Sequence, residues 1–189
     1  MNIPNRLTLA RLFLTVLFVG SMSITFPWAK IFAALIFLLA TLTDYLDGVL
    51  ARKLGLVTDF GKLMDPLADK IITASAFILF IPLHAMPAWV VIIIISREFL
   101  ITGLRVLANS KGIVLPAERL GKHKTAWQML TILYFLFLLA AGDFYPSLGG
   151  YKEFAWNWAG RCLVGITTLL TIYSGAAYLW KNRNLISDS

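Results

Sequence analysis

Long apolar runs separated by short polar segments dominate this chain of 189 residues. A helix needs about 20 predominantly apolar residues to cross a membrane, and the runs reach that length. The expected helices lie within residues 1–26 and at about 28–52, 59–80, 88–109, 122–141 and 154–180. The pattern predicts an all-α integral membrane protein with six transmembrane helices around a cytoplasm-facing polar cavity, in a single domain spanning residues 1–189.

The polar connections between these runs alternate in charge. Residues 21–27 and 82–87 contain no Lys or Arg, and residues 143–152 contain only Lys152. Most of the other basic residues lie in the alternate connections, and cytoplasmic connections of membrane proteins carry an excess of Lys and Arg. The charges therefore predict a multi-pass protein of the cell membrane with both termini in the cytoplasm.

Composition agrees with this prediction. Hydrophobic residues make up 59% of the chain and the mean hydropathy is +0.77, whereas a typical soluble domain is about 45–50% apolar. The net charge of +7 would suggest nucleic-acid binding in a soluble protein. Here the basic residues follow the membrane pattern, so we expect contact with anionic membrane lipids and no nucleic acid. The single cysteine, Cys162, cannot form an internal disulfide.

Four aspartates stand at helical spacing where the second and third predicted helices meet. Asp44 and Asp47 share one face of the first of these helices, and Asp65 and Asp69 share one face of the other. In a hairpin the carboxylates would converge, and carboxylates clustered near a membrane are costly unless cations lie among them. Mg²⁺ or Mn²⁺ prefers such oxygen ligands, so we expect a site for two ions at the membrane boundary. Simple helix capping is the alternative, but the regular spacing is hard to obtain by chance.

Residues 44–69 also resemble the signature of the CDP-alcohol phosphatidyltransferases, D-x-x-D-G-x-x-A-R followed after a gap by G-x-x-x-D-x-x-x-D. Every position is filled, by Asp44, Asp47, Gly48, Ala51, Arg52, Gly61, Asp65 and Asp69. The resemblance implies transfer of a substituted phosphate from a CDP-linked donor to an alcohol, with release of CMP. It also implies a homodimer, and donor binding by Gly48, Ala51, Arg52 and Gly61, with cytidine over the small residues Gly48 and Ala51.

The N-terminal helix carries three polar residues, Asn5, Thr8 and Arg11, roughly on one side and facing inward from the cytoplasmic boundary. Spacing alone leaves an ordinary basic anchor equally open. The segment also resembles the P-N-x-L-T-x-x-R opening common in bacterial members of the family. That resemblance implies that the three residues lie near the donor's diphosphate.

Basic residues gather around the longest predicted cytoplasmic connection. We predict that four of them bind the phosphate of a second substrate: Arg105, Arg119, Lys122 and Lys124. A phosphate-bearing acceptor would need such a group of cations, and ordinary positive-inside charge is the alternative. Charges within a membrane helix are costly and usually pair or serve function. For Glu98, beside Arg97, we favour a structural ion pair.

The resemblance implies a displacement at phosphorus in which the acceptor hydroxyl attacks and CMP leaves. Asp44, Asp47 and Asp65 would be metal ligands, and Asp69 would be both a ligand and the general base. Positioning and charge stabilisation dominate such transfers. Segments between residues 2 and 128 resemble family members that join CDP-diacylglycerol to glycerol 3-phosphate, so these are the implied substrates.

Charge alone does not choose the acceptor. A cardiolipin synthase or a phosphatidylinositol-phosphate synthase of the same family would also need a basic pocket, whereas a neutral acceptor such as serine would not. A divalent-cation transporter is the alternative from another class, since it too would use intramembrane carboxylates. A transporter predicts acidic residues near the bilayer midplane and broken helices, whereas these carboxylates cluster at one end of the helices.

Overall fold

The computed structural model describes residues 3–26, 28–54, 59–113, 115, 119–144, 153 and 155–183, with the backbone alone at 3–6, 44–54, 59–66, 69, 119, 143 and 144. This part of the chain forms α1 (Ile3–Ser23), α2 (Ala29–Leu54), α3 (Asp59–Phe80), α4 (Ala88–Ser110), α5 (Arg119–Phe144), the π-helix η2 (Ala155–Ala159) and α7 (Gly160–Lys181). The predicted all-helical architecture is confirmed for these ranges.

Most observed boundaries lie within a few residues of the predicted ones, and the last helix differs in kind. The expected continuous α-helix instead contains the π-helix η2 at Ala155–Ala159, which is followed by the α-helix from Gly160. This segment is held against α5, because the Tyr134 hydroxyl donates to the Ala155 carbonyl at 2.9 Å. The Trp156 ring lies 5.1 Å from the Phe135 ring, measured between centroids. Single-turn π segments are hard to foresee from apolar periodicity.

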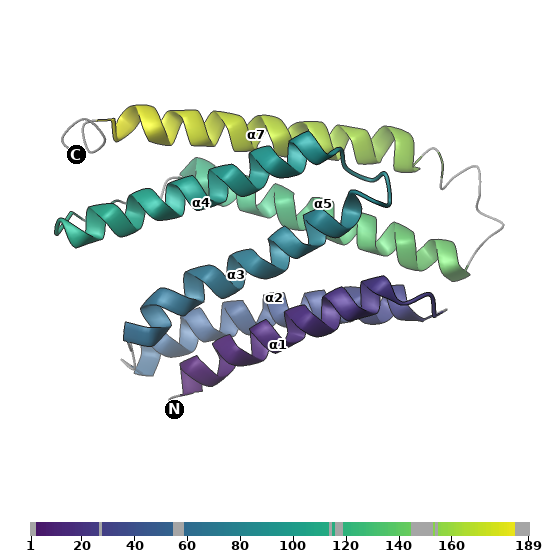
Figure 1. The fold of residues 1–189 in the computed structure, drawn as a ribbon, viewed down its shortest axis with the longest axis horizontal. Coiled ribbons are helices and arrows are strands. Elements are labelled where there is room, and N and C mark those ends of the chain that lie inside the picture. The colour runs from purple at the N-terminus through teal and green to yellow at the C-terminus, as the bar shows by residue number, and fades with distance from the viewer. Residues whose placement is uncertain are drawn as a thin grey trace.

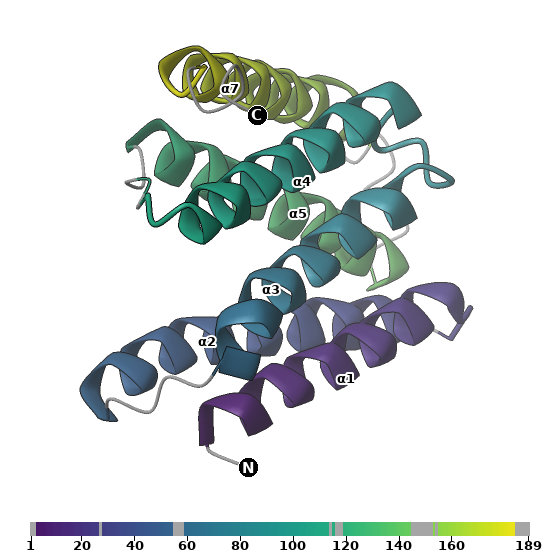
Figure 2. The same cartoon turned by 60° about the vertical axis from the view of Figure 1, so that its left-hand side comes forward.

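The helices are arranged with α1 and α2 on one side of the molecule, α7 on the other, and α3, α4 and α5 between them (Figures 1 and 2). Helix α1 packs against α2 and α3, and α7 packs against α4 and α5. Contacts of α5 with α2 and of α3 with α4 join the two sides. The N-terminal helices and the C-terminal helix therefore meet through the central three.

Successive helices run in opposite directions, so the connections fall at two ends of the molecule. The N-terminus, the end of α2, the start of α3, the end of α4, the start of α5 and the end of α7 lie at one end, on the left of Figure 1. These are the segments whose basic residues predict a cytoplasmic location. The short connection from α3 to α4 lies at the other end.

Aromatic and small side chains fill the interior. Phe18 of α1 and Phe37 of α2 are buried with ring centroids 5.7 Å apart, and Phe80 of α3 and Phe135 of α5 are buried at 5.5 Å. Buried aromatic pairs at such distances add to the free energy of packing.

The exterior is strongly apolar as well. Large side chains such as Val16, Phe137 and Leu169 are more than two-thirds exposed, and extensive exposed apolar surface indicates contact with a membrane or a partner. Residues Leu120–Gly142 and Ala155–Lys181 are long and apolar enough to cross a membrane. Shorter apolar helical stretches occur at Leu7–Ser23, Ala29–Thr43 and Lys70–Phe80.

Candidate active site

Both aspartate pairs lie on helical backbone, as predicted. Asp44 and Asp47 lie in the last part of α2, and Asp65 and Asp69 lie in the first half of α3. The end of α2 and the start of α3 are at the same end of the molecule (Figures 1 and 2), and α1 packs against both helices. Convergence of the four carboxylates stays a prediction, because these side chains lie outside the described part of the structure.

The binding of the CDP-linked donor by residues of the signature also stays a prediction. Gly48, Ala51 and Arg52 lie on α2 and Gly61 on α3, all with described backbone only. Among the side chains that the structure describes, no three His, Cys, Asp or Glu residues are grouped to hold a metal ion. The carboxylate groups of the four aspartates suit a hard divalent cation, which takes oxygen ligands.

Helix α1 turns polar residues toward the bundle. Thr8 and Arg11 are completely or almost completely buried, and Thr15, one turn later, donates its hydroxyl to the Arg11 carbonyl at 2.9 Å. The predicted inward face of α1 is therefore confirmed for Thr8 and Arg11, and the side chain of Asn5 lies outside the described residues. The guanidinium of Arg11 is thus buried on the face of α1 that packs against α2 and α3.

A basic cavity of about 460 Å³ lies between α3, α4 and α5. Its lining residues are Lys70, Arg97, Glu98, Ile101, Arg105, Gly121, Lys122, Lys124, Thr125, Ala126 and Met129. Three of the four cations predicted to bind the acceptor's phosphate thus surround one cavity, and Arg119 stands at the first position of α5 with its side chain not described. Lys70 directly follows Asp69 on α3, so the cavity adjoins the aspartate-bearing segment.

Glu98 is the centre of an ion-pair network in this cavity. Its carboxylate accepts a hydrogen bond from Lys124 and lies 3.6 Å from the Lys70 Nζ and 3.5 Å from the nearest Arg97 Nη. Lys70 also donates to the hydroxyl of Thr102. The predicted structural ion pair of Glu98 with Arg97 is confirmed, and the structure adds two lysines from α3 and α5.

The cations of the cavity differ in what already surrounds them. Lys124 is 2% exposed and bonded to Glu98, whereas Lys122 is exposed. Arg105 donates from Nε to the hydroxyl of Tyr178 at 3.3 Å, and its Cζ lies 5.5 Å from the centre of the Tyr178 ring. An anion that enters the cavity would therefore meet the exposed charge of Lys122 and the charges of Lys124 and Arg105, which are held in place by other side chains.

Sequence reasoning placed Lys70 beside the aspartates but gave it no part in the basic cavity, and it missed the contribution of α7. Ser174 accepts a hydrogen bond from Arg97 Nη2 at 3.3 Å, and Ser174 and Tyr178 are both 2% exposed. Polar side chains within an apolar helix are costly unless partnered. The i, i+4 spacing of Ser174 and Tyr178 was thus an available signal that α7 turns a polar face toward another helix.

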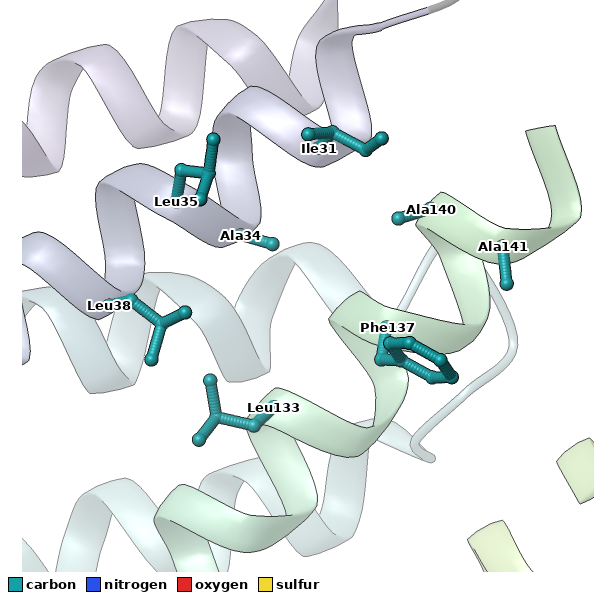
Figure 3. A pocket seen from close by; sticks show the side chains of 8 residues that line it. All are labelled: Ile31, Ala34, Leu35, Leu38, Leu133, Phe137, Ala140 and Ala141. Carbon is teal, nitrogen blue, oxygen red and sulfur yellow. The ribbon is translucent and has the colours of Figure 1, made fainter. Parts of the chain in front are cut away.

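A second cavity, of about 590 Å³, is apolar and lies between α2 and α5 (Figure 3). Its lining residues are Ile31, Ala34, Leu35, Leu38, Leu133, Phe137, Ala140 and Ala141. The α2 part of the lining ends at Leu38, six residues before Asp44 on the same helix. At 1.5 Å per residue, Leu38 is about 9 Å and Ile31 about 20 Å from Asp44 along the helix axis.

Comparison with known proteins agrees with the signature and its helical setting. Residues 1–178 match the sequence model of the CDP-alcohol phosphatidyltransferases. The chain belongs to the CDP-alcohol phosphatidyltransferase family. The signature of this family spans the end of α2 and the start of α3, next to the basic cavity.

Relatives within the family cover most or nearly all of the chain. Three are named CDP-diacylglycerol–glycerol-3-phosphate 3-phosphatidyltransferase. The Bacillus subtilis (strain 168) protein is 38% identical over 83% of this chain and 95% of its own length. The Rickettsia bellii protein is 34% identical over 94% and 93%, and the Salmonella typhimurium protein is 33% identical over 99% and 98%.

Proposed function

We propose that this protein transfers the phosphatidyl group of CDP-diacylglycerol to sn-glycerol 3-phosphate, giving phosphatidylglycerophosphate and CMP. The observation that carries the proposal is the complete family signature on two helix ends that adjoin a basic cavity. Relatives that share most of the chain are named for this reaction. A charged nucleotide head and a soluble phosphate ester would meet at this end of the helices, while the acyl chains stay in lipid.

The four aspartates would hold two divalent ions, Mg²⁺ or Mn²⁺. Bound there, such ions would neutralise phosphate oxygens and favour ionisation of the attacking hydroxyl. Asp69 would accept the proton of the acceptor hydroxyl as its oxygen bonds to the phosphatidyl phosphorus. The bond from that phosphorus to the CMP oxygen breaks, and CMP leaves with the electron pair.

The donor's nucleotide would lie between α1 and α2. Thr8 and Arg11 are buried on the inner face of α1, where a guanidinium can neutralise a diphosphate. Asn5 would assist on the same helix, Arg52 would contact the donor from α2, and Gly61 from α3. Gly48 and Ala51 on α2 would allow cytidine to approach the backbone closely.

The acceptor's phosphate would bind in the basic cavity. Arg105, Lys122 and Arg119 would contact it directly, because Arg and Lys donate charge-assisted hydrogen bonds to phosphate oxygens. Lys124 would act with Glu98, whose carboxylate offsets part of the positive charge. A net cationic cavity beside the aspartate segment keeps the anionic acceptor close to Asp69.

The donor's acyl chains would occupy the apolar cavity between α2 and α5. The cavity has an almost entirely aliphatic and aromatic lining (Figure 3). Its α2 residues lie about 9–20 Å along the helix from Asp44, a depth suited to a chain hanging from a head group at the aspartates. Helix α2 would thus contact both ends of one lipid.

We further propose a multi-pass topology in the cell membrane, with six spanning helices, both termini in the cytoplasm and the active site facing the cytoplasm. Its support is the alternation of helix directions together with the basic residues at the aspartate end (Figure 1). A homodimer, implied by the family resemblance, completes the proposal and is testable by the mass of the purified protein in detergent.

CMP release from purified protein in detergent tests the proposed reaction. CDP-diacylglycerol and Mg²⁺ are supplied with glycerol 3-phosphate, inositol phosphate, phosphatidylglycerol or serine in separate reactions. We expect release with glycerol 3-phosphate only. Release with inositol phosphate or phosphatidylglycerol would keep the chemistry and change the acceptor, because a basic cavity suits any phosphate-bearing acceptor. A folded protein that releases no CMP with any acceptor contradicts the proposal.

A further inference from the structure

The C-terminal helix α7 contacts two arginines of the basic cavity, although the cavity walls come from α3, α4 and α5. Arg97 and Arg105 both point from α4 and are eight residues apart, so they share a helix face. Ser174 and Tyr178 meet them from α7, with donor–acceptor distances of 3.3 Å in each case. Two successive turns of α7 thus contact arginines that lie eight residues apart on α4.

Tyr178 holds Arg105 in two ways. Its hydroxyl accepts from Nε, and its ring lies 5.5 Å from the guanidinium carbon, within the range of a cation–π contact. A guanidinium has five N–H donors, so bonding at Nε leaves the four Nη donors for a ligand. Tyr178 is itself 2% exposed, and its position is therefore fixed by packing.

Gly175 sets how closely Arg97 approaches α7. A Cβ placed at Gly175 would lie 3.0 Å from Cγ of Arg97, closer than side chains normally pack. The absence of a side chain at Gly175 lets the Arg97 stem lie against the α7 backbone, where Ser174 accepts its hydrogen bond. Even alanine at this position would move Arg97 by a few tenths of an ångström.

We propose that Ser174, Gly175 and Tyr178 form a positioning surface that fixes Arg97 and Arg105 for recognition of the acceptor's phosphate. The inference rests on the proposed function, and it assigns to α7 a part in acceptor selectivity. These three are positioning residues, since each acts through an arginine of the cavity. Holding the guanidinium groups in place before binding lowers the entropy lost when the acceptor binds.

Steady-state kinetics of Tyr178→Phe test the inference, because phenylalanine keeps the ring and removes the hydroxyl. We expect the KM for glycerol 3-phosphate to rise about 3–10-fold, the effect of one hydrogen bond, with kcat and the donor KM within about twofold of wild type. Tyr173→Phe is the matched control, because Tyr173 lies on the same helix and is 63% exposed. A purely structural role would lower the thermal midpoint and leave the acceptor KM unchanged.

A second variant and a double-mutant cycle separate the outcomes. Gly175→Ala should also raise the acceptor KM, whereas Gly165→Ala should not, because a Cβ at Gly165 meets nothing within 4 Å. In an Arg105→Gln background, Tyr178→Phe should have no further effect, since it acts through Arg105.

The failures of the two proposals are distinguishable. A wild-type protein that is inactive with glycerol 3-phosphate would overturn the proposed function and this inference with it. An active wild type whose acceptor KM is unaffected by both Tyr178→Phe and Gly175→Ala overturns the inference alone. Additive effects of Tyr178→Phe and Arg105→Gln would also overturn it.

Discussion

Replacing Glu98 by glutamine tests whether the carboxylate stabilises the three cations around it. Glutamine keeps the size of the side chain and removes its charge. Lys70, Arg97 and Lys124 would then each lose the carboxylate with which it pairs. Their side chains are 20%, 13% and 3% exposed, so water screens them only in part.

The size of the effect follows from the distances. At an effective dielectric constant of about 20, unit charges 3.6 Å apart attract by about 4–5 kcal/mol before desolvation is subtracted. Removing one partner of a fully buried ion pair costs about 3–5 kcal/mol, and surface pairs are worth about 1 kcal/mol or less. With the Glu98 side chain 18% exposed, we expect a loss of about 2–3 kcal/mol of unfolding free energy. In a chain of this length that loss lowers the thermal midpoint by about 4–12 °C.

Thermal unfolding of purified protein in detergent, followed by circular dichroism, measures this loss. Glu153→Gln is the matched control, since Glu153 is exposed and its substitution should change stability by less than about 0.5 kcal/mol. Combining Glu98→Gln with Lys124→Met should cost at least about 1 kcal/mol less than the sum of the single changes. A Glu98→Gln protein as stable as the Glu153→Gln control would refute the reasoning.

Three further predictions address the apolar cavity, helix packing and the metal. Leu38→Trp should raise the KM for CDP-diacylglycerol about tenfold, which corresponds to the loss of about two buried methylene groups. Leu39→Trp should leave this KM unchanged, because Leu39 is similarly exposed but does not line the cavity. Equal effects of the two substitutions would count against acyl-chain binding in the cavity. Gly160→Ala should lower the unfolding free energy by about 1–3 kcal/mol, because its Cβ would lie 3.0 Å from the Phe135 ring. Gly103→Ala is the control, because a Cβ at Gly103 meets nothing within 4 Å. Equal stabilities of the Gly160→Ala and Gly103→Ala proteins in detergent would contradict this prediction. EDTA should stop CMP release and added Mg²⁺ should restore it, and activity that survives chelation would argue against a metal site.

Apolar patterning predicted the helices well because each run is long and clearly bounded. The pairs Asp44/Asp47 and Asp65/Asp69 could be placed on helices from spacing alone. The inward orientation of Thr8 and Arg11 followed from the same periodicity, since residues three or four apart share a face. Helix positions and helix faces can be predicted because they depend on residues that are close together in the sequence.

Contacts between helices distant in sequence could not be predicted in this way. The partners of Arg105 and Glu98 lie on α7, α3 and α5, and spacing within α4 carries no information about which helix packs beside it. Pairing of Glu98 with Arg97 was foreseeable only because the two are adjacent. The π-helix at Ala155–Ala159 likewise depends on packing against α5.

Transfer of labelled glycerol 3-phosphate into lipid tests the central claim most directly. Purified wild-type protein is incubated with CDP-diacylglycerol, Mg²⁺ and labelled glycerol 3-phosphate, and both the lipid-phase label and the CMP are measured. We predict equimolar CMP and labelled phosphatidylglycerophosphate, loss of both in Asp69→Asn, and normal amounts in Asp143→Asn, which changes an aspartate at the far end of α5. CMP released without label entering the lipid, or full transfer by Asp69→Asn, would contradict the account.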